Sequence, residues 1–403
     1  MPTLSSSRPR ALAALTVASV TLLGALAGAT SPAGAGVDAP APASAKAAAK
    51  QKTTITVLPP ISQPGKKAGK AKKAQTVVTA TFTPAQKNRT VTLFIKAGGF
   101  KKVATTKTTK AGYADFSVPT KKGAVYKATA ASYKGNPAVT TKTAKNTWKK
   151  ADFVDEFGGS TLGSDWTHRA PFYNPEGLRN CSKGDPSAVA VTGGALRLSV
   201  LADPARAAES CTALRGDGSV IGQFKFRLNG HISTNGNHDF RYGVAAARMK
   251  FQKERGQHAS FWLQPTAHKP EATTAKVGGA EVDIIEWFGE GGKQSGLTSF
   301  IYHPSTKGPV KVGGFLKQQD RFLASKKDSW FKGYHVFSVE WTPQHYIFRI
   351  DGRVSAKITV GISEVKQYPI LSLLSSDYEL ENLGSESKLP QHSYVDWMQI
   401  WER

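Results

Sequence analysis

Short runs in which apolar and polar residues alternate make up most of the chain. They occur at residues 76–82, 90–95, 113–118, 242–251, 258–264, 334–341 and 346–350. A period of two places every second side chain on the same face, which indicates β-strands rather than helices. Only residues 318–329 suggest one short helical turn. Many antiparallel strands with two apolar faces predict an all-β protein built from stacked sheets.

One predicted strand carries three acids. Residues 278–287 read Gly-Gly-Ala-Glu-Val-Asp-Ile-Ile-Glu-Trp, with only apolar residues between the acids. Glu281 and Asp283 share a face, and Glu286 joins them if one extra residue at Ile284–Ile285 forms a β-bulge. The carboxyl groups of Glu281 and Glu286 would then lie roughly 5 Å apart, the separation that retaining glycoside hydrolases use. The alternative is a solvated acidic strand edge.

This motif resembles the active-site motif of glycoside hydrolase family 16 in its bulged, laminarinase-like form. Other segments within residues 151–403 resemble the family in the same order: 155–157, 241–250, 261–265, 340–352 and 395–397. The resemblance implies a β-jelly-roll sandwich with a concave substrate cleft. It also implies that Glu281 is the nucleophile and that Glu286 is the general acid and then the base. Asp283 would hydrogen-bond Glu281 and hold its orientation.

The candidate substrate-binding residues follow from position and resemblance. Alternation places Trp262 on a cleft-like face with His258, Ser260 and Gln264, and the resemblance makes Trp262 a platform for a sugar ring. The full set is Trp262, Trp287, His303 and Asn174. Ordinary sheet packing is the alternative for Trp262, and a surface position is the alternative for His303.

No metal is expected in catalysis, because the nine histidines lack zinc-type spacing, and no other cofactor is expected. Many relatives of the fold hold a structural Ca²⁺, and hard oxygen ligands suit that ion. Glu156, the Gly194 carbonyl and Asp396 match its site.

The resemblance implies retaining, endo-acting hydrolysis of a β-linked polysaccharide, most similar to β-1,3- or β-1,3-1,4-glucanases. Agar- and carrageenan-type galactans are alternative substrates, because enzymes acting on them share the bulged motif. A transglycosylase would use the same residues. A non-catalytic glycan-binding or cell-wall-binding protein is a further alternative, but its acid triad is expected to be broken, and here it is intact.

The chain opens like an exported bacterial protein. Arg8 and Arg10 precede an apolar run, and Ala33-Gly34-Ala35 reads as a cleavage site, so residues 1–35 are predicted to be a signal peptide of a secreted, extracellular protein. A membrane anchor is the alternative; after cleavage no membrane contact is expected. Residues 36–52 read as an Ala-, Pro- and Lys-rich linker.

Two domains are predicted after the linker. Residues 53–148 have the strand spacing of a small immunoglobulin-like β-sandwich, and residues 151–403 form the catalytic domain. The formal net charge is +25, and residues 51–150 hold 21 Lys plus Arg against one acid, Asp115. Such a field attracts polyanions. We expect an anionic cell-wall polymer rather than nucleic acid, since no nucleic-acid motif accompanies the lysines. Alternatively, the lysines only solubilise the strands. A monomer is expected.

The two cysteines are Cys181 and Cys211. In an exported chain an even number predicts one disulfide. Two free buried thiols are the alternative.

Overall fold

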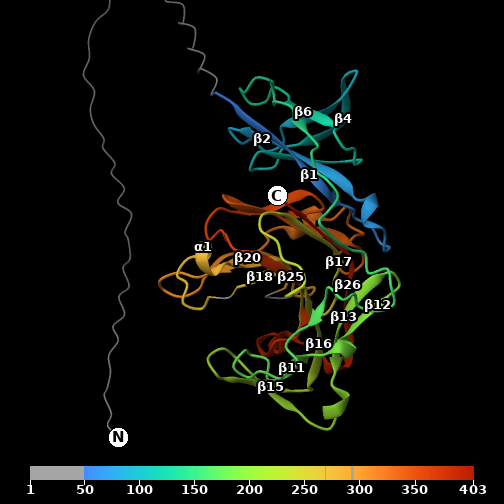
Figure 1. Ribbon diagram of the computed structural model, residues 1–403, viewed down its shortest axis with the longest axis vertical. Coiled ribbons are helices and arrows are strands. Elements are labelled where there is room, and N and C mark those ends of the chain that lie inside the picture. Colours follow the sequence, from blue (N-terminus) through green and yellow to red (C-terminus); the bar gives the residue numbers. More distant parts are fainter. Residues whose placement is uncertain (1–49, 268, 292–294) are drawn as a thin grey trace, which may run out of the picture. The chain divides into compact units, whose positions relative to one another are not determined.

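The computed structural model describes residues 50–267, 269–291 and 295–403 (Figure 1). The predicted signal peptide lies outside these residues, as does most of the predicted linker. Residues 48–403 form one compact unit. Within the described ranges, no helix is long and apolar enough to cross a membrane.

Two small sheets come first. The three-stranded sheet has the order β1-β2-β5, and the five-stranded sheet contains β4-β3-β6-β7 with β8 paired to β6. The bounds are β1 Lys52–Ser62, β2 Gln75–Thr83, β3 Thr90–Ala97, β4 Gly99–Lys107, β5 Tyr113–Val118, β6 Val125–Ala130, β7 Val139–Thr140 and β8 Ala144–Lys145. Alternate residues of both sheets, among them Val78, Leu93 and Tyr126, are buried in a core between them.

The remaining strands build a much larger sheet. Its main path is β21-β20-β19-β18-β25-β16-β13-β26-β17-β22-β23-β24. The bounds are β9 Phe153–Asp155, β10 Thr167–His168, β11 Ser182–Gly184, β12 Val189–Thr192, β13 Ala195–Ala202, β14 Cys211–Leu214, β15 Val220–Phe224, β16 Arg227–Ser233, β17 Gly243–Lys250, β18 His258–Pro265, β19 Glu281–Trp287, β20 Leu297–His303, β21 Val310–Phe315, β22 His335–Thr342, β23 His345–Ile350, β24 Arg353–Ile358, β25 Gln367–Leu374 and β26 Gln391–Glu402. β14 and β15 are outside this sheet and pair with each other in a two-stranded one.

This sheet folds into two layers at β16. Residues 227–229 of β16 pair with β13, and residues 230–233 pair with β25. One core joins residues from both layers, including Phe261 and Val282 from one and Val339 and Phe348 from the other. The all-β jelly-roll prediction is therefore confirmed, because the alternating apolar faces of the two layers bury each other.

Helical segments are short. They are the α-helix α1 Ala275–Gly278 and the 3₁₀ turns η1 Ala71–Lys73, η2 Pro186–Ala188, η3 Pro204–Arg206, η4 Gln319–Phe322, η5 Asp377–Asn382 and η6 Glu386–Lys388. The turn η4 falls where the sequence suggested one. The turn η5 matters most for function, because it borders the cleft described next.

The small sandwich shares an apolar layer with the large one. Leu58, Ile61 and Val77, from β1 and β2, pack in one buried cluster with Trp397 and Trp401 of β26. A buried polar contact lies nearby: Arg349 Nη1 of β23 donates to Thr79 Oγ1 of β2 at 2.8 Å.

Candidate active site

The three acids of β19 lie on one face because the strand bulges. Towards β18, Phe261 pairs with Ile285 and Trp262 pairs with Asp283, which leaves Ile284 as the extra residue. The register towards β20 shifts between Asp283 and Glu286. Ile284 and Ile285 are both buried in the core. The predicted bulge is confirmed.

The acid-bearing face forms the floor of a cleft of about 870 Å³. Glu281, Asp283 and Glu286 all line it, together with Trp262 and His258. A second hollow of about 640 Å³ adjoins the cleft and shares Gln264, Glu281 and Tyr302 with it. The acids therefore lie within a groove that continues past Glu281.

Glu281 is the least buried of the three acids. Gln264 Nε2 donates to its Oε2 at 3.2 Å. Burial raises the pKa of Glu281, and the charge of Glu286 adds to this; the Gln264 hydrogen bond and the charges of Arg169 and Arg179 oppose it. The Gln264 hydrogen bond and the two arginine charges thus favour the ionised form of Glu281 against the effect of burial.

Asp283 lies between the two glutamates and is only 3% exposed. Its Oδ2 is buried and has no hydrogen-bond partner among the described residues. Burial raises the pKa of Asp283 well above its usual value, and the charges of Glu281 and Glu286 raise it further. Burial and the two neighbouring charges therefore favour the protonated form of Asp283 more than in a free Asp side chain.

Glu286 is 9% exposed and has partners on both oxygens. Thr298 Oγ1 donates to Oε2 at 3.0 Å, and Ser260 Oγ donates to Oε1 at 3.5 Å. The Nε2 atom of His258 lies 3.7 Å from Oε1. Burial raises the pKa of Glu286, while the charge of His258 and the Thr298 hydrogen bond hold it back. A raised pKa suits a group that must donate a proton near neutral pH.

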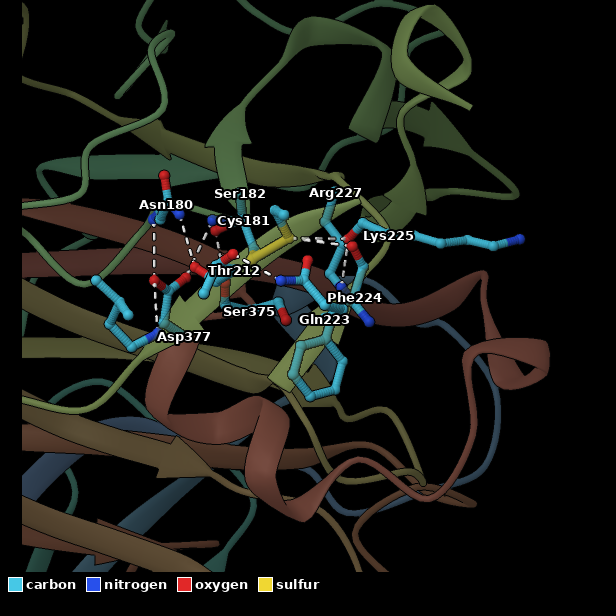
Figure 2. The surroundings of a disulfide bond; sticks show 12 residues. Asn180, Cys181, Ser182, Thr212, Gln223, Phe224, Lys225, Arg227, Ser375 and Asp377 are labelled. Carbon is cyan, nitrogen blue, oxygen red and sulfur yellow. Dashed lines mark hydrogen bonds between the residues drawn. A yellow bond between two sulfur atoms is a disulfide. The ribbon is translucent and has the colours of Figure 1, made fainter. Parts of the chain in front are cut away.

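One wall of the cleft is fixed by the disulfide. Cys181 and Cys211 are bonded, with an S–S distance of 2.06 Å, as predicted (Figure 2). The adjoining residues 177–179 line the cleft. Asp377, the first residue of η5, accepts from Cys181 N at 3.0 Å and donates its own N–H to Leu178 O at 2.8 Å. The disulfide thus ties this wall to β14, and Asp377 ties it to the turn that carries Tyr378 and Glu379, which also line the cleft.

The predicted substrate-binding residues are only partly brought together. Trp262 lines the cleft, where its Nε1 donates to Ser372 Oγ at 3.1 Å and its ring stacks on His231. His303 lines the adjoining hollow. Asn174 is exposed and lines neither hollow, although Gly177, which donates its N–H to Asn174 Oδ1 at 3.0 Å, does line the cleft.

Trp287 requires a correction. It is 2% exposed, packs in the core between the layers and donates its Nε1–H to Gln252 O at 2.7 Å. The alternation that turns Glu286 to the cleft turns the next residue to the opposite face. Trp287 is therefore a core residue and does not contact substrate.

The expected Ca²⁺ site also requires a correction. Asp396 forms an ion pair with Arg248, both side chains being 2% exposed, and accepts from Gly69 N at 2.9 Å and 3.1 Å. Glu156 accepts from Ala71 N at 2.7 Å and lies 3.3 Å from the Lys70 ammonium group.

These contacts do not fit a calcium ion, because cationic groups already neutralise both acids. Gly194 lies in the turn between β12 and β13. Across the described ranges, no group of three or more His, Cys, Asp or Glu could hold a metal ion.

Sequence reasoning missed four charged groups of the cleft: Arg179, His258, Lys311 and Glu379. His258 was placed on the correct face but given no role. Glu379 could have been noticed from Ser376-Asp-Tyr-Glu379, whose capping-box pattern the structure forms. Arg179 lies in an irregular segment, where no periodic pattern marks a side chain as facing a cleft.

Part of the chain matches a known protein family. The model of glycosyl hydrolases family 16 matches residues 205–399. This segment contains β18, β19, β20 and β25, and hence all three acids and the strands beside them.

Two of the solved structures to which this chain is similar are glucan-degrading enzymes by name. The laminarinase catalytic domain of Thermotoga maritima is 15% identical, with a TM-score of 0.46, over 63% of this chain and 98% of that one. The endo-β-1,3-glucanase of Pyrococcus furiosus is 18% identical, with a TM-score of 0.47, over 62% of this chain and 94% of that one.

One curated relative is Gram-negative bacteria-binding protein 1 of Drosophila melanogaster. It is 25% identical over 156 residues, which are 34% of this chain and 28% of the relative. The match therefore spans less than a third of that relative's length.

Proposed function

From the premise that residues 205–399 form a glycosyl hydrolases family 16 domain, we propose that this protein is a retaining endo-glycoside hydrolase. Its proposed substrate is a β-linked polysaccharide, preferably a β-1,3- or β-1,3-1,4-glucan. The observation that carries the proposal is the bulge in β19, which brings Glu281, Asp283 and Glu286 onto the floor of one cleft.

In the first step, the Glu281 carboxylate attacks the anomeric carbon while Glu286 donates its proton to the leaving glycosidic oxygen. A covalent glycosyl-enzyme results. In the second step, the Glu286 carboxylate takes a proton from water, and the hydroxide oxygen displaces Glu281 with net retention. Asp283, whose pKa burial raises well above its usual value, can in its protonated form donate a hydrogen bond to Glu281 and balance its changing charge.

The shape of the groove supports action within a polysaccharide chain. The two hollows meet at Gln264, Glu281 and Tyr302, so sugar units can extend beyond the reacting one. Trp262 offers an indole ring on the cleft floor, where the apolar face of a sugar can stack.

We also propose export of this enzyme through its leader and a role in contact with extracellular polymer. The lysine-rich segment 51–150 would hold an anionic cell-wall polymer by charge attraction.

The test is reducing-end release from laminarin, lichenan, agarose and carrageenan, with product anomers followed by NMR. We expect release from laminarin or lichenan and a β-anomer as the first product. Glu281→Gln and Glu286→Gln should each abolish release while leaving the unfolding midpoint near that of the wild type. Turnover like that of the wild type in either variant would refute the assignment. Longer oligosaccharides in place of free reducing ends would indicate a transglycosylase.

Non-catalytic glycan binding is the second candidate, favoured by the match to a relative named as a bacteria-binding protein. It predicts retention on insoluble glucan without any product. The intact acid triad favours hydrolysis, and the same substrate panel separates the two.

A further inference from the structure

We infer that His258, held by Glu379, is a positioning residue that keeps a positive charge beside the general acid Glu286. This inference rests on the proposed function, because it assigns Glu286 the role of proton donor. The site then includes His258 of β18 and Glu379 of η5, a buried pair, in addition to the three acids of β19.

The three side chains form a line. His258 Nδ1 donates to Glu379 Oε2 at 2.8 Å, and on the other side of the ring Nε2 lies 3.7 Å from Glu286 Oε1. The second distance is too long for a hydrogen bond but short for two charges. The same Glu379 oxygen also accepts from Ser376 N at 2.8 Å, which anchors the carboxylate to the start of η5.

The line is shielded from water. The side chains of His258 and Glu379 are 6% and 4% exposed. The ring of Phe288 stacks on the imidazole, with centroids 5.1 Å apart. In such surroundings, charges a few ångströms apart interact far more strongly than in water. A charged imidazole here therefore acts on the Glu286 carboxyl group with little screening.

The imidazole is favoured in its charged form. Burial lowers the pKa of His258, but the charge and hydrogen bond of Glu379, together with the charge of Glu286, outweigh it and raise the pKa above its usual value. The neighbouring His231 shows what happens without such a partner. Both its ring nitrogens lack hydrogen bonds among the described residues, and burial lowers its pKa strongly.

Glu286 has further titratable neighbours on the elements around it. They are Glu281 and Asp283 on β19, Lys311 on β21, Tyr378 and Glu379 on η5, and Arg179 on the disulfide-linked wall. Of the groups that oppose the effect of burial on the Glu286 pKa, His258 is the largest contributor. The charge of His258 therefore limits how far the pKa of Glu286 rises. Glu286 can then lose its proton in the first step and act as the base in the second.

The direction of the expected change follows from these charges. In Glu379→Gln the imidazole loses its carboxylate partner, burial makes it neutral, and the pKa of Glu286 rises. The lost negative charge of Glu379 acts the other way, but from the far side of the imidazole. Since the reaction needs protonated Glu286, the basic limb of the profile of kcat/KM against pH should move to higher pH, by about 1 pH unit.

The experiment measures this profile for the full chain and three variants on the best glucan of the panel. Glu379→Gln and His258→Gln should move the basic limb upward. Glu379→Asp, which retains the charge, should keep the limb near that of the wild type. Ser260→Ala serves as the matched control: it removes a long, uncharged contact to the same Glu286 oxygen and should move the limb clearly less than Glu379→Gln does, whatever it does to the rate. An unmoved limb in Glu379→Gln, or an equal shift in Ser260→Ala, would overturn the inference.

A second measurement does not depend on catalysis. NMR titration of the His258 ring should give an elevated midpoint in the wild type and a lower one in Glu379→Gln. If no polysaccharide is cleaved but this titration behaves as expected, the proposed function fails and the charged pair stands. If glucan is cleaved but His258 titrates alike in the wild type and in Glu379→Gln, the inference about the His258–Glu379 pair is wrong and the proposed hydrolase function is retained.

Discussion

The buried pair of Arg248 and Asp396 offers the sharpest test of how the small sandwich is attached. Arg248, on β17, forms this ion pair with β26 and donates to three carbonyl oxygens before η1: Nε to Gln63 O at 2.6 Å, Nη1 to Lys67 O at 3.1 Å and Nη2 to Gly65 O at 3.3 Å. Replacing Arg248 with Met removes the charge but retains an unbranched apolar stem.

The size of the effect follows from burial. Both side chains are 2% exposed, so Asp396 would remain as a buried charge with only the Gly69 N–H as donor. Breaking a buried pair from one side costs roughly 3–5 kcal/mol. In the double variant Arg248→Met/Asp396→Asn no charge is left, and we expect about 0.5–3 kcal/mol of this loss to be recovered.

The loss should depend on pH in a defined direction. Burial raises the pKa of Asp396, and Arg248 opposes this, so removing Arg248 raises the pKa further. A carboxyl group whose pKa is higher in the folded state costs stability only where it must ionise. The loss should therefore be small below the usual pKa of Asp, grow as pH rises towards the folded value, and be complete above it.

Urea unfolding, followed by tryptophan fluorescence at acidic and neutral pH, measures the loss in Arg248→Met, the recovery in the double variant and the dependence of the loss on pH. The unfolding midpoint of the wild type should not respond to Ca²⁺ or to EDTA, because Arg248 already neutralises Asp396. A loss below about 1 kcal/mol in Arg248→Met at neutral pH, well under the cost of breaking a buried pair, would refute this reasoning. So would a double variant that is no more stable than the single one.

Two further predictions concern the cleft. Asp283→Asn should retain clearly more of kcat than Glu281→Gln, because a neutral amide can replace the protonated carboxyl group as donor; equal loss in an assay on the same glucan would contradict this. The double variant Cys181→Ser/Cys211→Ser should lose about 3–4 kcal/mol of unfolding free energy, since the bond closes a loop with a sequence separation of 30. Its KM should also rise because residues 177–179 loosen, and an unchanged KM would separate this wall from substrate binding.

The acid strand could be predicted because its chemistry and its periodicity lie in the same few residues. Three carboxylates among β-branched residues fix both the strand and the need for a bulge. Applied one residue further, the same alternation would have assigned Trp287 to the core. Trp287 was assigned to substrate binding because aromatic residues can stack on sugars, and not because the alternation placed it in the cleft.

The remaining site residues depend on contacts between distant segments. Glu379 meets His258 across a sequence separation of 121, and no local pattern joins them. The calcium expectation failed for a similar reason. The groups that contact Asp396 and Glu156 include Gly69, Lys70 and Ala71, which lie in a segment that sequence reasoning assigned to a separate domain.

The extra residue in β19 makes the geometry of the acids discontinuous. In a regular strand the side-chain direction reverses at every step, so no smooth adjustment leads from a strand without the bulge to one with it. Sequence change can vary the groups around Glu281 and Glu286 by degrees, but it can alter the number of residues between them only by whole steps. Inserting or deleting one residue between Glu281 and Glu286 would replace an acid on the cleft floor with a hydrophobic side chain such as Trp287. The number of residues between the two acids therefore cannot change gradually.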